Sequence, residues 1–162
     1  MPLLRPLALL FTLFLLATPS HAQDGKIAIQ KYNYAEWTKG IFSEATTVTI
    51  GTTKFIYLAG IGAEDENGPR GKIRNPGDFV EQCKYSYDKI KRALAANGAQ
   101  LSDAVKITTY MTDLRFRLDM GKCIGASWGG VTFPSHTLIG VAALAFPEMI
   151  VEVDVTAVVQ AK

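Results

Sequence analysis

Alternating apolar and polar side chains predict three strands in the middle of the chain. Two β-rich runs, Thr46 to Ile50 and Lys54 to Gly60, flank a Gly-Thr-Thr turn and predict a hairpin. Between Asp103 and Thr112, one face of the alternation is apolar and the other polar, which predicts another strand. The segment from Gly62 to Gly77 is rich in glycine, proline, asparagine and acids, and predicts an exposed loop after the hairpin.

Apolar residues spaced three and four apart predict a helix that starts after Asn75-Pro76-Gly77-Asp78 and ends at Asn97-Gly98. Its apolar stripe consists of Phe79, Cys83, Tyr87, Ile90 and Leu94. A weaker helix is predicted from Phe116 to Trp128, where two glycines lower the helical propensity. The first helix also carries a basic cluster interleaved with Glu81 and Asp88, which predicts a solvated face; its members are Lys84, Lys89, Lys91 and Arg92.

Two further strands, His136 to Ala145 and Met149 to Val159, are predicted in the C-terminal third. The resulting order, ββ-α-β-α-ββ, predicts an α+β domain with a mixed sheet and two helices on one face. The hairpin also carries apolar residues such as Phe55 and Tyr57 opposite the predicted core face. A sheet that is apolar on both faces, with helices for only one, favours self-association.

The N-terminus has the pattern of a cleaved signal peptide. A single cation, Arg5, precedes an apolar run from Leu7 to Ala17, and Ser20 and Ala22 occupy the −3 and −1 positions of a cleavage site. The run is shorter than the roughly 20 residues that a membrane span needs. We therefore expect segment 1–22 to be removed and the protein to be periplasmic or secreted, with an uncleaved N-terminal anchor as the alternative.

The expected mature chain consists of an N-terminal extension, 23–40, and one domain, 41–162. Without Arg5 it has 16 basic residues against 15 acidic ones. This balance argues against nucleic acid or an anionic membrane as a partner, because both favour a concentrated basic face. Cys83 and Cys123 lie in helical patterns, so we expect two separate buried thiols, although export would permit a disulfide.

Common catalytic patterns are excluded by their context. Gly125-Ala126-Ser127-Trp128-Gly129 matches the nucleophile elbow of hydrolases, but a predicted helix precedes the serine where a strand is needed. One histidine in the mature chain and two isolated cysteines predict no metal site, and Lys72 lacks the other residues of a phosphate-binding loop. Gly60, His136 and Glu152 remain, and their residue types alone favour purely structural roles.

Five motifs follow one another between about Gly40 and Val159: Y-L-A-G-I at 57–61, L-A-A-N-G at 94–98, V-K-I-T-T-Y-M-T-D at 105–113, F-P-S-H-T at 133–137 and V-E-V-D at 151–154. Together they resemble the RidA/YjgF family of reactive intermediate deaminases. The resemblance implies a chorismate-mutase-like fold and a homotrimer with three clefts between subunits. It also implies hydrolysis of enamines and imines to ammonia and a 2-keto acid without a metal or cofactor.

The resemblance assigns roles to individual residues. Glu152 matches the glutamate that positions the attacking water, and Gly60 matches the strand-end glycine that offers backbone contacts. Phe42 stands at the position of a tyrosine in the family, and we group it and Thr137 with Gly60 as substrate-binding residues. His136 occupies the position of the family's arginine, and we assign it a catalytic role beside Glu152.

The substitution at His136 changes the expected chemistry. The family's arginine pairs with the substrate carboxylate, whereas imidazole offers at most two divergent donors and is mostly neutral above about pH 6.5. Losing the charged fork weakens the anchoring of a 2-imino acid by about 2 kcal/mol or more. The family's nearby cysteine is Leu138 here, and the asparagine of the second helix falls at Met120 or Gly121.

Two functional hypotheses follow. In the first, the protein is a hydrolase acting on an imine, enamine or related metabolite, in which Glu152 orients water and His136 binds a less demanding group or shuttles a proton. In the second, the same cleft captures a small metabolite of the exported compartment without turnover. Ribonuclease activity is also associated with such proteins, but this sequence shows no basic groove that could bind RNA.

Overall fold

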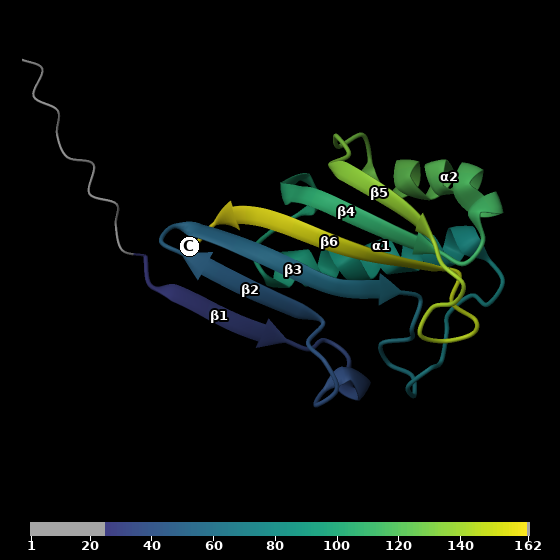
Figure 1. The fold of residues 1–162 in the computed structure, drawn as a ribbon, viewed down its shortest axis with the longest axis horizontal. Helices are drawn as coiled ribbons and strands as arrows, with labels where there is room; N and C mark the ends of the chain where they lie inside the picture. The colour runs from purple at the N-terminus through teal and green to yellow at the C-terminus, as the bar shows by residue number, and fades with distance from the viewer. Residues whose placement is uncertain (1–24, 162) are drawn as a thin grey trace, which may run out of the picture.

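One mixed sheet with strand order β1-β2-β3-β6-β4-β5 organises the protein (Figure 1). The structure is a computed structural model and describes residues 25–161, so the expected signal peptide lies outside the described residues. The strands are β1 (Ile27–Tyr32), β2 (Ala45–Ile50), β3 (Thr53–Gly62), β4 (Ala104–Met111), β5 (Ser135–Gly140) and β6 (Val151–Gln160). Only β4 and β5 pair in parallel, and every other neighbouring pair is antiparallel.

The expected order of elements is confirmed, with one more strand at the N-terminal side. This strand, β1, pairs with β2 at the sheet edge and falls within the segment 23–40 that the sequence leaves as an extension. The strand expected at 136–145 ends earlier, at Gly140, and residues 141–150 form a loop. The buried Gln82 holds this loop, because its side chain donates to the carbonyl of Glu148 and accepts from the Ile150 amide.

Both helices, α1 (Phe79–Ala96) and α2 (Arg117–Trp128), cover the same face of the sheet, behind it in Figure 1. As predicted, α1 starts after Asp78, whose carboxylate accepts from the Glu81 amide at 3.0 Å. Gly98, with φ of +78°, follows its C-terminus in the left-handed conformation. Among the described residues, no helix is both long and apolar enough to cross a membrane.

The helix-covered face of the sheet forms the core. Its strands contribute alternate residues that are fully or almost fully buried, including Ile56, Leu58, Val153 and Val155. The opposite face has no covering element within residues 25–161 and exposes Tyr57 there. The sequence pattern predicted this division, since Ile56 and Leu58 alternate with the residues of the open face.

The expectation of two unpaired thiols is wrong. Cys83 of α1 and Cys123 of α2 form a disulfide, with their Cα atoms 6.0 Å apart. Both cysteines are buried, as expected from their places in apolar helical patterns. Sequence spacing did not reveal the pairing, because it depends on how α1 and α2 pack across the core, and the two residues are 40 positions apart.

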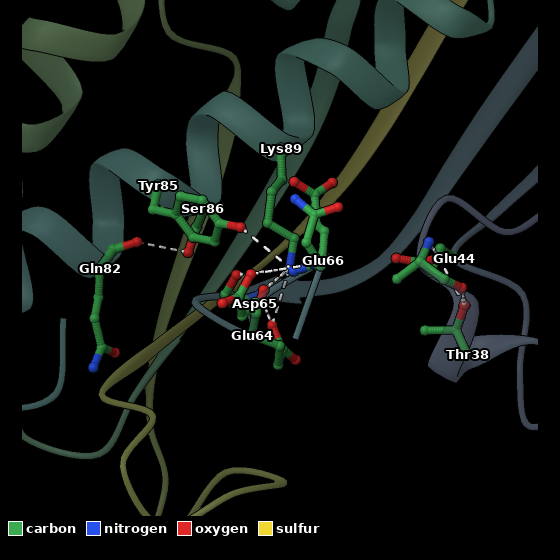
Figure 2. A network of polar contacts seen from close by, with 12 residues as sticks. Thr38, Glu44, Glu64, Asp65, Glu66, Gln82, Tyr85, Ser86 and Lys89 are labelled. Carbon is green, nitrogen blue, oxygen red and sulfur yellow. Dashed lines mark hydrogen bonds and ion pairs between the residues drawn. The ribbon is translucent and has the colours of Figure 1, made fainter. Parts of the chain in front are cut away.

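The expectation of a fully solvated basic face on α1 is also wrong in one position. Lys89 is only 7% exposed, and its ammonium pairs with the Glu64 carboxylate at 3.2 Å (Figure 2). It also donates to the carbonyl oxygens of Gly62 and Glu64, at 3.1 and 3.0 Å. The remaining members of the cluster do pair with acids near the surface: Lys84 with Glu81, Lys91 with Asp88 and Arg92 with Glu66.

Candidate functional site

A hollow of about 340 Å³ lies where β3 and β6 meet three loops. It brings together three of the residues that the sequence nominates, Phe42, Gly60 and Glu152. The rest of the lining is Trp37, Ile41, Ala59, Glu64, Arg70, Ala145 and Phe146. A concave, mainly apolar surface with a few polar groups is typical of a small-molecule site.

Gly60 is required for the close approach of the Glu152 side chain. A Cβ atom built on residue 60 would overlap the carboxylate and the side-chain carbons of Glu152. The register of β3 against β6 also shifts between Leu58 and Ile61, which marks an irregularity beside this glycine. Any larger residue at position 60 would therefore displace the carboxyl group from the hollow.

Glu152 has an altered acidity in this setting. Burial raises its pKa to about 7, and the negative charges of Glu64 and Asp154 contribute in the same direction, while Lys89 opposes them. Near neutral pH the side chain is therefore divided between its acid and its carboxylate. Such a group can accept a proton in one step and donate it in another.

This pKa shift predicts a pH-dependent effect of Glu152→Gln on stability. The folded state binds more protons than the unfolded state between the ordinary pKa of 4.5 and about 7. The free energy of unfolding of the wild type therefore falls as pH rises through this window. The neutral amide of Glu152→Gln does not titrate, so its free energy of unfolding does not fall in this way. Relative to the wild type, the free energy of unfolding of the variant should therefore rise by about 1–2 kcal/mol between about pH 5 and pH 8, allowing for solvent screening of this half-buried group.

Urea unfolding of both proteins at the two pH values measures this difference, and effects of other titrating groups cancel in the comparison. If the stability difference between Glu152→Gln and the wild type stayed constant between the two pH values, the carboxyl group would not titrate as the structure requires.

Three aromatic rings form the apolar wall of the hollow. Trp37 packs edge-on against Phe42 and Phe146, with ring centroids 5.9 and 6.1 Å apart. The buried Glu44 holds the turn that carries Trp37, because one carboxylate oxygen accepts from the amides of Tyr34 and Ala35 at 2.6 and 2.9 Å. The same oxygen accepts from the Thr38 hydroxyl at 2.8 Å (Figure 2).

His136 lies in a different hollow, of about 520 Å³, beside α2. Its neighbours there are Arg117, Leu118, Met120, Gly121 and Leu138. The Nε2 atom of His136 lies 3.0 Å from the Thr109 hydroxyl. Burial, together with the nearby Lys106 ammonium, lowers the pKa of His136, so the ring is neutral at physiological pH.

Strand register places His136 and Glu152 on opposite faces of the sheet. His136 pairs with Ile107, which is buried under the helices, whereas Glu152 pairs with Tyr110, three positions further along β4. Neighbouring residues across a ladder share a face, and odd shifts along a strand change the face. One chain therefore does not bring the two side chains together.

Thr137 lies outside both hollows. It follows His136 directly and so points to the opposite face of β5, where the Lys106 ammonium donates to its hydroxyl.

Within residues 25–161, histidine, cysteine and acidic side chains form no group of three that could hold a metal ion.

Sequence reasoning missed several residues of the first hollow. Trp37 lies in the segment treated as an extension, and Arg70 and Phe146 lie in loops without a distinguishing pattern. Glu64 belongs to no recognisable motif in the sequence, and it lines the hollow while its carboxylate pairs with the Lys89 ammonium. These residues come together because the β1–β2, β3–α1 and β5–β6 loops meet at one end of the sheet (Figure 1).

The mixed sheet, two helices on one face and an apolar hollow containing a carboxyl group define a small α+β protein with a candidate ligand-binding pocket. The family model of endoribonuclease L-PSP matches residues 36–159. A RutC family protein of Pyrococcus abyssi is 33% identical over 106 residues, which cover 65% of this chain and 76% of that protein. The chain therefore belongs to the RidA/YjgF family, as its motifs predicted.

Solved structures show the same fold. RidA from an Antarctic Psychrobacter bacterium matches with a TM-score of 0.64 and 24% identity, over 85% of this chain and 99% of that chain. The Rid family protein YyfA from Yersinia pestis matches with a TM-score of 0.68 and 20% identity, over 83% of this chain and all of the other. These similarities establish the architecture, and the family membership supports a small-molecule-binding or deaminase-type role.

Proposed function

We propose that three copies of this chain assemble so that the Glu152 hollow of one subunit faces the His136 hollow of the next. The observation that carries this proposal is the division of the family-matched positions into two sets. Phe42, Gly60 and Glu152 line one hollow, and the positions matching the family's arginine, cysteine and asparagine line the other. Because these sets lie apart in one chain, a cleft containing both requires a second copy.

The proposed reaction is metal-free hydrolysis of an imine or enamine. The Glu152 carboxylate accepts a proton from water as the water oxygen bonds to the imine carbon and the C=N bond becomes single. The protonated Glu152 then returns this proton to the nitrogen. The proton of the new hydroxyl group passes to the same nitrogen as the C–N bond breaks, so that ammonia leaves and the ketone forms. A pKa near 7 suits both transfers at neutral pH.

Export to the periplasm or the exterior is part of the proposal. The pattern of segment 1–22 supports it, and the Cys83–Cys123 disulfide provides independent support, because such bonds persist mainly in oxidising compartments.

The proposed function predicts that the wild type accelerates ammonia release from 2-iminopropionate, which is the small reference substrate for this reaction. We expect Glu152→Gln to lower kcat by about a hundredfold or more, because the amide accepts no proton. Asp154→Asn is the comparison variant: it removes a neighbouring charge that helps to raise the pKa of Glu152 but leaves the Glu152 carboxyl group in place, so it should lower kcat far less than Glu152→Gln. Full activity in Glu152→Gln, or a stable monomer in light scattering at micromolar concentration, would remove this mechanism.

A non-catalytic binding protein is the second candidate, and the neutral His136 favours it. A neutral imidazole at this position cannot make the bidentate contact by which a guanidinium orients a substrate carboxylate. A binding protein would show saturable thermal stabilisation by small carboxylates without any product.

A further inference from the structure

The loop between β3 and α1 carries one cation that is not neutralised. Lys72 and Arg74 both pair with the buried Asp65, at 3.1 and 3.2 Å. Arg70 lines the Glu152 hollow, yet no carboxylate within residues 25–161 lies within ion-pair distance of it. Its guanidinium is therefore free to bind an anion.

The acids of the hollow do not cancel the charge of Arg70. Glu64 is paired with the Lys89 ammonium at 3.2 Å, and that ammonium is itself buried. Glu152 is divided between its neutral and charged forms near pH 7, because burial raises its pKa. The hollow consequently combines a free cation with a carboxyl group that can donate a hydrogen bond, a pairing that favours a carboxylate ligand.

The apolar side of the hollow is aromatic. Trp37 packs edge-on against both Phe42 and Phe146, and all three rings line the hollow, so this wall favours a ligand with a flat ring or a large apolar group. Arg70 and Phe146 both line the hollow, and a Cβ atom built on the next residue, Gly71, would lie 3.3 Å from the Phe146 ring. Arg70 is therefore adjacent to this wall. A volume of about 340 Å³ is at the small end for ligand sites and suits a single ring with a short acidic chain.

We propose that Arg70 anchors the carboxylate of the ligand, and that Trp37, Phe42 and Phe146 select ligands with an aromatic or large apolar side chain. This inference rests on the proposed function for its reaction, and it makes the substrates 2-imino acids with such side chains. It also assigns Arg70 the carboxylate contact that the neutral His136 does not provide. Arg117 beside His136 is the competing anchor, but no aromatic wall lines its hollow.

Binding of unreactive acids tests the anchor without any turnover. Calorimetry with the purified full chain would compare 3-phenylpropionate with its neutral analogue 3-phenylpropionamide, and with propionate, which lacks the ring. We expect the wild type to bind the aromatic acid in a saturable manner and to prefer it over both analogues by roughly tenfold or more. Arg70→Ala should abolish the preference of acid over amide while leaving amide binding unchanged.

Two variants serve as matched controls. Lys72→Ala removes a neighbouring loop cation that pairs with Asp65, and Arg117→Ala removes the cation of the other hollow. Both should keep the preference for the acid. No saturable binding by the wild type, an acid preference that survives Arg70→Ala, or its loss in Arg117→Ala would each overturn the proposal.

These outcomes are separable from those of the proposed function. Loss of imine hydrolysis in Glu152→Gln tests the chemistry, whereas the Arg70 experiment uses ligands that cannot react. Trp37→Leu adds a test of the aromatic wall, because it should reduce the preference for 3-phenylpropionate over propionate without changing the preference of acid over amide.

Discussion

Lys89→Met is expected to lower the free energy of unfolding by about 3–5 kcal/mol, because it leaves Glu64 as an unpaired charge in a buried site. Both side chains of the pair are almost fully buried. The lysine ammonium also binds two backbone carbonyls, which would lose their charged donor. Methionine preserves most of the volume of the lysine stem, so the expected loss comes from charge and hydrogen bonding.

Chemical denaturation of Lys89→Met and the wild type measures this loss, and Lys91→Met is the matched control. Lys91 is two positions further along α1 and pairs with Asp88 at the surface, so its replacement should change stability by about 0.5 kcal/mol or less. Adding Glu64→Gln to Lys89→Met should recover part of the loss, because it removes the uncompensated charge. Equal unfolding midpoints for Lys89→Met and Lys91→Met would refute the prediction.

Local patterns were sufficient to predict most of the fold. The Asp78 cap and the Asn97-Gly98 exit defined the limits of α1, and alternation in β6 identified the face that packs under the helices. These features depend on residues near each other in the chain, which a sequence displays directly. Strand β1 escaped notice because all but one of its residues are exposed, so no buried face imposes an alternating pattern.

Helix α1 carries a second buried stripe, made mainly of polar residues, beside its apolar stripe. Gln82, Ser86, Lys89 and Ala93 are separated by four, three and four residues, and all four are buried. This spacing is the same as that of the apolar stripe beside them. Of these residues, the sequence pattern placed only Lys89, and it placed it wrongly on a solvated face. Figure 2 shows Lys89 directed toward Glu64, whereas the Gln82 amide donates to the carbonyl of Glu148.

The candidate site was only partly accessible to sequence reasoning. Family motifs identified Gly60 and Glu152, and the structure explains their connection through the overlap that any Cβ at residue 60 would create. Trp37 and Arg70 come from separate loops and reach the hollow through tertiary contacts, which a single sequence does not encode as a local pattern. The same limit applied to the cysteines, whose pairing is determined by the packing of α1 against α2.

Replacing both cysteines by alanine is expected to lower the free energy of unfolding by about 2–4 kcal/mol. The Cys83–Cys123 bond closes a segment of 40 residues, and opening it increases the conformational freedom of the unfolded chain. The bond also connects the two helices within the apolar core, where both cysteines are buried. Urea denaturation under non-reducing conditions measures the difference between the double variant and the wild type.

Reduction separates the effect of the covalent link from the effect of lost volume. Dithiothreitol opens the bond in the wild type but leaves both sulfur atoms in place, so any loss of stability then reports the cross-link, whereas the alanine variant also loses packed volume. The wild type should therefore become less stable in reductant, while the double variant should not respond. A wild type whose unfolding midpoint stayed the same with and without reductant, once free thiols were detected, would show that the link contributes nothing to stability and that packing alone holds α1 against α2.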